Sequence, residues 1–148
     1  MTELRGVLET VVYAVDLDAA ERFYAEVLGL QPISRTPGRS VFFRSGPGVF
    51  LVFNPESTAT TVVHTNGVPI PIHGARGAGH AAFRVHEDEL PAWRRRLEER
   101  NVPIEAEIAW PQGGRSIYVR DPAGNSIELA TPALWGFPEQ PTPRGSAA

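Results

Sequence analysis

The sequence contains no cysteine among its 148 residues. This absence excludes disulfide bonds, thiolate catalysis and cysteine-bound zinc or iron–sulfur sites, and it leaves histidine and carboxylates as the ligands for any metal. No apolar run approaches the roughly 20 residues that a membrane-spanning helix needs. The N-terminal stretch MTELRGVLETVVYAV carries Glu3 and Glu9 where a signal peptide is first basic and then apolar. We therefore expect a cytoplasmic protein with no membrane partner.

The chain also lacks an excess of positive charge. Its formal net charge is −3 and its pI is about 5.8, so no broad positive field exists to hold a phosphate backbone, and we expect no nucleic-acid partner. The fractions of hydrophobic residues (42%) and charged residues (21%) are those of an ordinary globular domain. We expect one domain over residues 1–136. Residues 137–148 are rich in proline and small residues, which predicts a disordered tail.

The sequence repeats itself. RSVFFRSGPGVFLVF from Arg39 matches RSIYVRDPAGNSIEL from Arg115 without a gap, at an offset of 76 residues, and GVLETVVYAV from Gly6 resembles GAGHAAFRV from Gly77, at an offset of 71. Each copy is patterned as a strand, a helix and three further strands. We therefore predict an α+β fold with a first module at about residues 6–55, a linker at 56–76 and a second module at about 77–132.

Two amphipathic patterns predict the helices. The first begins at a capping aspartate, Asp16 or Asp18, with Glu21 placed to complete a capping box on Asp18, and it ends at Gly29. The second has Pro91 in its first turn and ends at Asn101. The predicted apolar positions are Leu17, Ala20, Phe23, Tyr24, Val27 and Leu28 in the first helix, and Leu90, Trp93 and Leu97 in the second.

Strand alternation places three polar side chains opposite the apolar, helix-facing side of their strands: Glu9, His80 and Glu128. Under the two offsets, Glu9 corresponds to His80 and Glu128 corresponds to Val52. A pseudo-twofold pair of modules brings these four positions together. Two carboxylates in one pocket repel each other unless one is protonated or a cation lies between them. An imidazole and two carboxylates suit Fe(II), Mn(II), Zn(II) or Ni(II) with open coordination positions, whereas Val52 cannot bind a metal.

The segments ETVVYAVDLDAAERFYAEVLGL, GHAAFRV and RSIYVRDPAGNSIELATP resemble the vicinal oxygen chelate superfamily. That superfamily includes glyoxalase I, extradiol dioxygenases and bleomycin-resistance proteins, and the resemblance covers about residues 6–132. It implies paired βαβββ modules that form a cupped mixed sheet with helices on the outside, a divalent metal ion and a homodimer. It also implies that Glu9, His80 and Glu128 are the metal ligands. Val52 departs from glyoxalase I, and Glu9 departs from the two-histidine, one-carboxylate set of the dioxygenases.

Other interpretations of these residues remain open. Glu9 can instead be an edge carboxylate paired with Arg84 or Arg5, and His80 can be a hydrogen-bonded structural histidine. His73, in the loop HGARGAGH, is either an additional ligand or general base or a surface histidine of the linker. We predict Arg84, Tyr118 and His73 as substrate-binding residues. Trp93 is predicted in the helix core, and Trp110 and Trp135 are predicted at the rim or tail.

Two functions fit this sequence. In the first, the protein is an enzyme whose metal binds two oxygens of a small oxygen-rich substrate, with Glu9 and Glu128 as catalytic groups that act as ligand and base. Lyase, isomerase and dioxygenase chemistry all remain open for such an enzyme. In the second, the protein is a metal-free binder of the bleomycin-resistance type that sequesters an aromatic or cationic compound in a dimer groove.

Overall fold

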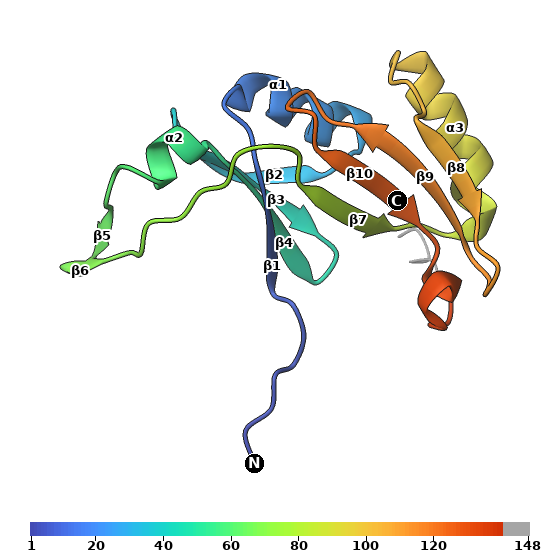
Figure 1. The fold of residues 1–148 in the computed structure, drawn as a ribbon, viewed down its shortest axis with the longest axis horizontal. Helices are drawn as coiled ribbons and strands as arrows, with labels where there is room; N and C mark the ends of the chain where they lie inside the picture. Colours follow the sequence, from blue (N-terminus) through green and yellow to red (C-terminus); the bar gives the residue numbers. More distant parts are fainter. Residues whose placement is uncertain (141–148) are drawn as a thin grey trace, which may run out of the picture. The chain divides into compact units, whose positions relative to one another are not determined.

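Residues 1–140 are described by the computed structural model, in which each repeat of the sequence forms a four-stranded sheet (Figure 1). The strand order is β1-β4-β3-β2 in the first sheet and β7-β10-β9-β8 in the second. Contacts divide the chain into two compact units, Met1–Ala81 with Arg120–Ser126, and Ala82–Val119 with the chain from Ile127 onward. The predicted α+β class is confirmed. Most of the predicted tail, from residue 141, lies outside the described residues, and in residues 1–140 no helix is long and apolar enough to span a membrane.

The first sheet follows the predicted order of strand, helix and three strands. Strand β1 runs parallel to β4, and β3 runs antiparallel to both β4 and β2. The ring of Tyr24 packs at 4.8 Å from Phe50 and 5.7 Å from Phe43, so one face of the sheet is buried under the helix. Burial of each such side chain contributes about 1.5–3 kcal/mol. The strands are β1 (Glu9–Tyr13), β2 (Gln31–Thr36), β3 (Ser40–Ser45) and β4 (Gly48–Phe53).

The helix of the first unit begins as predicted but continues differently. Asp16 is the N-cap of α1 (Leu17–Arg22), and its carboxylate accepts a 2.9 Å hydrogen bond from the backbone of Ala19. The predicted capping box between Asp18 and Glu21 does not form, because both carboxylates bind Arg35 of β2 instead. The chain then widens into a π-helix, η1 (Phe23–Val27), before Gly29 adopts a left-handed conformation at φ 77° and ends the helix.

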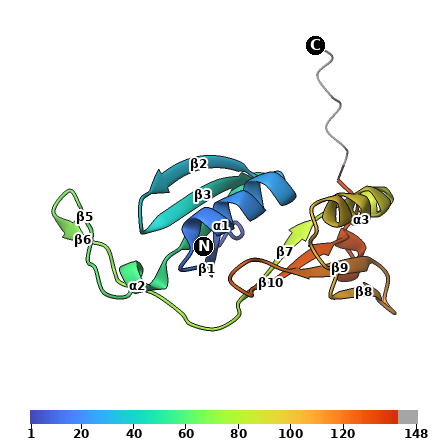
Figure 2. The same cartoon turned by 90° about the horizontal axis from the view of Figure 1, so that it is seen from above.

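The second sheet repeats the arrangement. Backbone bonds from Ser126 to Gly79 and from Val85 to Ala130 tie the starts and the ends of β7 and β10 together, so these neighbours run parallel. Figure 2 shows α3 along one side of the sheet. Leu90 and Leu97 of α3 are buried, whereas Trp93, predicted in the core, is half-buried. The elements are β7 (His80–Arg84), η2 (Glu87–Glu89), α3 (Leu90–Glu99), β8 (Ala106–Ala109), β9 (Arg115–Arg120), β10 (Ser126–Ala130) and η3 (Pro132–Trp135).

The predicted linker at 56–76 contains structure that the sequence pattern did not indicate. A short helix, α2 (Pro55–Thr58), is capped by Asn54, and it is followed by a two-stranded hairpin of β5 (His64–Thr65) and β6 (Val68–Pro69). Asn66 and Gly67 form the hairpin turn with φ values of 52° and 77°. This Asn-Gly pair is typical of a tight hairpin turn, because both central residues need positive φ.

The gapless alignment of the two repeats is wrong in their last strands. Val52 of β4 pairs with Val41 of β3, and Phe50 pairs with Phe43, so Phe50 and Val52 occupy the helix-facing side of β4. The fully buried residues of β10 are Ile127 and Leu129. Matching the two buried faces requires an odd offset, here 77 in place of 76, and the turn before β10 (121–125) is longer than the turn before β4 (46–47). A one-residue shift reverses the faces of a strand, so Glu128 corresponds to Leu51, and Val52 lies on the face opposite Glu9.

Candidate functional site

The side of the second sheet that faces away from its core carries the polar groups. Ile108 of β8 pairs with Ser116 of β9, and Ala106 pairs with Tyr118, while Ile117 and Val119 alternate onto the buried side. In β10 the same alternation separates Glu128 from Ile127 and Leu129. We call this side the open face of the second sheet. It carries Ser116, Tyr118 and Glu128.

Glu128 is held in place by its neighbours on this open face. Its side chain is only 5% exposed, and its Oε1 accepts a 2.5 Å hydrogen bond from Ser116 Oγ. Ser116 Oγ in turn accepts a 2.8 Å hydrogen bond from the indole Nε1 of Trp110. The structure thus places a buried carboxylate in a defined orientation. Sequence reasoning missed the roles of Ser116 and Trp110, although alternation in β9 already puts Ser116 on the face of Tyr118.

Tyr118 adds to this environment. Its burial raises the pKa of the phenol, and the neighbouring Glu128 carboxylate, which accepts a hydrogen bond from it, raises that pKa further. The phenol therefore stays protonated at neutral pH and acts as a hydrogen-bond donor. Tyr118 is half-buried on the open face, and its role in substrate binding stays a prediction.

His80 begins β7, the strand that neighbours β10. Its Nδ1 lies 3.0 Å from the backbone carbonyl of Ser126. A carbonyl oxygen only accepts hydrogen bonds, so Nδ1 carries the hydrogen and the lone pair of the neutral imidazole is on Nε2. The backbone bond from Ser126 to Gly79 pairs His80 with Ser126 in the parallel ladder, which puts His80 on the open face together with Glu128. Two of the three predicted ligands therefore lie on the same side of neighbouring strands.

Glu9 is the first residue of β1 and is exposed. It pairs with Val49 of β4 and belongs to the first unit, on the side of the first sheet that faces away from Tyr24. The two alternative partners considered for Glu9 have other neighbours. Arg5 lies 3.6 Å from Glu3, and the guanidinium of Arg84 lies 6.0 Å from the centre of the Phe137 ring.

His73 is anchored rather than held on a mobile loop. Its Nδ1 is 2.7 Å from the hydroxyl of Tyr13, and its ring meets Phe53 edge-on at 4.8 Å. Its backbone N–H donates to the carbonyl of Thr58. Tyr13 alternates with Glu9 on the same face of β1, so His73 covers part of the face on which Glu9 lies.

The DPAGN segment between β9 and β10 is structural. The Nδ2 of Asn125 donates to the carbonyl of Tyr13 at 3.0 Å, and its Oδ1 accepts from the N–H of Gly79 at 2.8 Å. One amide therefore ties the end of β1, the strand of Glu9, to the residue before His80. Asp121 supports this amide by accepting a hydrogen bond from Nδ2 at 2.8 Å.

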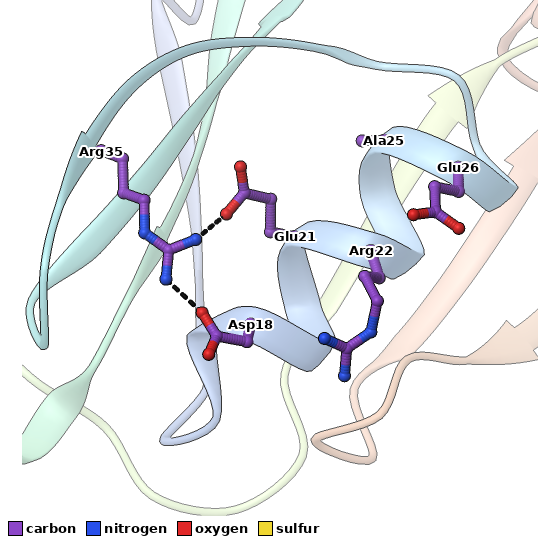
Figure 3. Close-up of a pocket in the computed structure, with 6 residues that line it drawn as sticks. All are labelled: Asp18, Glu21, Arg22, Ala25, Glu26 and Arg35. Atoms are coloured by element: carbon purple, nitrogen blue, oxygen red, sulfur yellow. Dashed lines mark hydrogen bonds and ion pairs between the residues drawn. The ribbon is translucent and has the colours of Figure 1, made fainter.

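Two cavities lie away from these groups. A hollow of about 260 Å³ lies beside α1 (Figure 3). Arg35, one of its lining residues, is bound to Asp18 and Glu21, so the charge of this guanidinium is already paired. A second hollow, of about 570 Å³, is at the end of α3 and is lined by Arg94, Glu98, Asn101, Val102, Pro103 and Ile104. Neither contains a predicted site residue. In residues 1–140, no group of three or more His, Asp and Glu side chains is close enough together to hold a metal ion, and the set of Glu9, His80 and Glu128 stays a prediction.

Comparisons with known proteins agree with this fold. Residues 6–129 match the model of the Glyoxalase/Bleomycin resistance protein/Dioxygenase superfamily. The crystal structure of lactoylglutathione lyase from Agrobacterium tumefaciens is 42% identical, with a TM-score of 0.84 over 92% of this chain and all of that one. A glyoxalase/bleomycin resistance protein/dioxygenase from Nocardioides is 21% identical, with a TM-score of 0.69 over 96% of this chain and 93% of that one.

Among curated proteins, metallothiol transferase FosB from Bacillus licheniformis is 25% identical over 134 residues, which cover 90% of this chain and 79% of that protein. The protein belongs to the Glyoxalase/Bleomycin resistance protein/Dioxygenase superfamily, which confirms the resemblance stated from its sequence. The matched range also agrees with the residues on which that resemblance rested.

Proposed function

We propose that the protein is a metal-dependent enzyme of this superfamily that acts on a small, oxygen-rich substrate by chelation of two substrate oxygens. The observation that carries the proposal is the buried Glu128 carboxylate, held by Ser116 on the open face where His80 also lies. A carboxylate that is only 5% exposed loses hydration, and binding to a cation offsets that cost.

The chemistry of the three proposed donors suits a divalent metal, although in residues 1–140 their side chains are not gathered into one ligand cluster. The Nδ1–H of His80 is directed to a backbone carbonyl, which is the usual arrangement for a histidine that binds metal through Nε2. Glu128 supplies a fixed carboxylate and Glu9 supplies an exposed one. An imidazole with two carboxylates suits Fe(II), Mn(II), Zn(II) or Ni(II). A metal held by these residues would supply Lewis-acid chemistry for polarising the substrate oxygens.

The remaining residues orient the substrate and move protons. Tyr118 keeps its proton and donates a hydrogen bond to a substrate oxygen or to Glu128. Arg84, exposed on the open side of β7, attracts an anionic substrate group. Glu9 is the proposed base, because Glu128 is held by Ser116 and Tyr118 whereas Glu9 is exposed at a strand end. His73 is placed to bind substrate on the face that Glu9 shares.

The names of the relatives support enzymatic chemistry. The 42% identical Agrobacterium structure is that of a lyase, and FosB is a transferase. We propose lyase or isomerase chemistry first and dioxygenase chemistry second, because of the similarity to that lyase. A homodimer in the cytoplasm is the proposed state of the protein, and light scattering tests the first part by a mass of twice 16.1 kDa.

Sequestration of a ligand without metal is the second candidate function. It is favoured by Leu51, the apolar counterpart of Glu128 in the first sheet, and by the rings of Tyr13, Phe42 and Phe53 on the same side of that sheet. Aromatic walls of this kind bind planar or cationic compounds without a metal. Metal dependence therefore separates the two functions.

The deciding experiment is elemental analysis of protein purified without chelator, followed by calorimetric titration of Mn, Fe, Co, Ni and Zn. We expect one divalent ion per chain in the wild type and at least a tenfold loss of affinity in His80→Ala. The matched control is His64→Ala, in the exposed hairpin strand β5, which should bind like the wild type. Absence of binding by the wild type to all five metals, or equal binding by His80→Ala, would reject the metal site and leave sequestration.

A further inference from the structure

Trp110 and Ser116 form a hydrogen-bonded chain that ends on Glu128. The indole Nε1–H donates to Ser116 Oγ at 2.8 Å, and Ser116 Oγ is 2.5 Å from Glu128 Oε1. An indole nitrogen can only donate, so Ser116 Oγ accepts from it and directs its own hydrogen to the carboxylate. The indole is thereby the donor to Ser116, and Oε1 of Glu128 accepts from Ser116 beside the hydrogen bond that Tyr118 makes to the same carboxylate.

The first member of this chain is itself rigid. Trp110 donates its backbone N–H to the carbonyl of Gly114 and accepts from the N–H of Gly113, both at 3.0 Å, so it closes a tight turn after β8. Gly114 has φ 83°, and a Cβ at this position would lie 2.4 Å from the backbone nitrogen of Leu134. The turn therefore packs directly against η3, and the position requires glycine. The backbone hydrogen bonds of Trp110 therefore fix the position from which its indole side chain extends.

Burial increases the free-energy cost of breaking the hydrogen bonds between Trp110, Ser116 and Glu128. Ser116 is 1% exposed and Glu128 is 5% exposed, so little water is available to replace a lost donor. A hydrogen bond to a charged, buried acceptor is stronger than one between neutral groups, and an unsatisfied charged group is costly. Ser40, which corresponds to Ser116 in the first repeat, is equally buried at 3% but has an apolar residue, Leu51, in place of the carboxylate. The polar chain is thus specific to the second sheet.

We infer that Trp110 and Ser116 are positioning residues for Glu128, and that they fix the carboxylate in the orientation needed to bind the divalent cation. The inference rests on the proposed metal site. It assigns roles to two residues outside the proposed set of metal ligands. It also makes Trp110 a reporter, because a cation bound by Glu128 changes the charge seen through two hydrogen bonds and hence the indole emission.

The test uses the full-length protein and Zn²⁺ or Mn²⁺ alone as the probe. Ser116→Ala and Trp110→Phe remove the hydroxyl and the indole N–H, and Ser116→Thr restores a hydroxyl. Outer hydrogen-bond partners of metal ligands contribute about 10- to 100-fold to affinity. We expect Ser116→Ala to weaken metal binding about tenfold or more, Trp110→Phe to weaken it severalfold, and Ser116→Thr to recover most of the loss. In the wild type, metal should change the tryptophan emission, and Trp110→Phe should abolish that change.

Ser40→Ala and Trp93→Phe are the matched controls, and both should bind metal like the wild type. Urea unfolding of each variant separates a general loss of stability from a specific loss of affinity. If the wild type binds metal and Ser116→Ala and Trp110→Phe bind it equally well, the positioning role is wrong while the metal site stands. If Ser116→Ala does not fold, Trp110→Phe decides. If the wild type binds no metal, both the proposed function and this inference are rejected.

Discussion

The hydroxyl of Tyr24 donates a 2.7 Å hydrogen bond to Asp121, a residue 97 positions away in the sequence. Tyr24 is fully buried and Asp121 is 4% exposed. Burial and the neighbouring carboxylate both raise the pKa of Tyr24, so the phenol keeps its proton and remains a donor. This bond connects η1 to the DPAGN turn within the first unit.

Replacing Tyr24 with phenylalanine should lower the free energy of unfolding by about 1–3 kcal/mol, because a buried carboxylate loses a donor. Urea denaturation measures this loss. Tyr13→Phe is the control, because Tyr13 is half-buried and its partner is the half-buried His73 rather than a buried charge. A loss for Tyr24→Phe no greater than that of the control would show that the bond to Asp121 does not contribute.

Asn125→Asp changes the hydrogen-bonding character of one side chain without changing its size. It replaces the amide donor that serves Tyr13 and Asp121 with a carboxylate that faces another carboxylate. We expect a destabilisation of about 2–4 kcal/mol at neutral pH from the lost donors and the repulsion. The loss should shrink as the pH falls, because one of the two carboxyl groups then binds a proton. A constant loss at all pH values would contradict the repulsion.

Much of the architecture was predictable from residue patterns. Alternation identified β1, β7 and β10, and the helical spacing with Asp16 as cap located the start of α1. These features depend on neighbouring residues, which a single sequence contains. The π-helix at Phe23–Val27 was not predictable from helical spacing, and the partner of its Tyr24, Asp121, is brought close only by the tertiary structure.

The same distinction applies to the candidate site. The face of Glu128 followed from alternation, but its contact with Ser116 depends on the pairing of β9 with β10, and the donor Trp110 belongs to a turn. The error at Val52 has a similar cause, since the longer turn before β10 shifts the matching faces by one residue relative to the gapless alignment, which leaves the sequence similarity intact while reversing the faces.

The register of β4 gives a test at Val52. Val52 is fully buried on the helix-facing side, so Val52→Glu should destabilise the protein by about 3 kcal/mol or more by burying an unpaired charge. Val49→Glu is the matched control, on the opposite side of the same strand and half-buried, with an expected loss below about 1 kcal/mol. Thermal unfolding compares the two. A stable Val52→Glu with tighter metal binding would restore the original alignment.

The ion pair between Arg94 of α3 and Glu107 of β8 should make stability depend on pH. Its hydrogen bonds, at 2.7–2.9 Å, hold the pKa of Glu107 below its ordinary value of 4.5. A carboxylate with a lowered folded-state pKa stabilises the fold above the unfolded pKa, and the contribution is lost as the pH falls through the folded pKa. Both side chains are about one-third exposed, so solvent screening limits the contribution to about 0.2–1 kcal/mol.

Glu107→Gln should therefore be less stable than the wild type near neutral pH, and the two should converge in acid. Chemical denaturation at a series of pH values measures the difference. Glu99→Gln, an exposed carboxylate at the end of α3, should match the wild type throughout. A difference that persists unchanged in acid would point to lost packing of the side chain rather than to the ion pair.

Glu128→Gln separates an enzyme from a sequestering protein. The substitution keeps the size of the side chain and an oxygen that can accept from Ser116, but it removes the charge that the proposed metal requires. For an enzyme, we expect metal-dependent binding or turnover of a small oxygenated substrate to fall at least tenfold, which corresponds to about 1.4 kcal/mol. Glu107→Gln is the control, because Glu107 lies on the other side of the same sheet, and it should leave binding and turnover unchanged. A binder that relies on aromatic walls keeps its ligand affinity after chelator treatment and in Glu128→Gln, and that result would favour sequestration over catalysis.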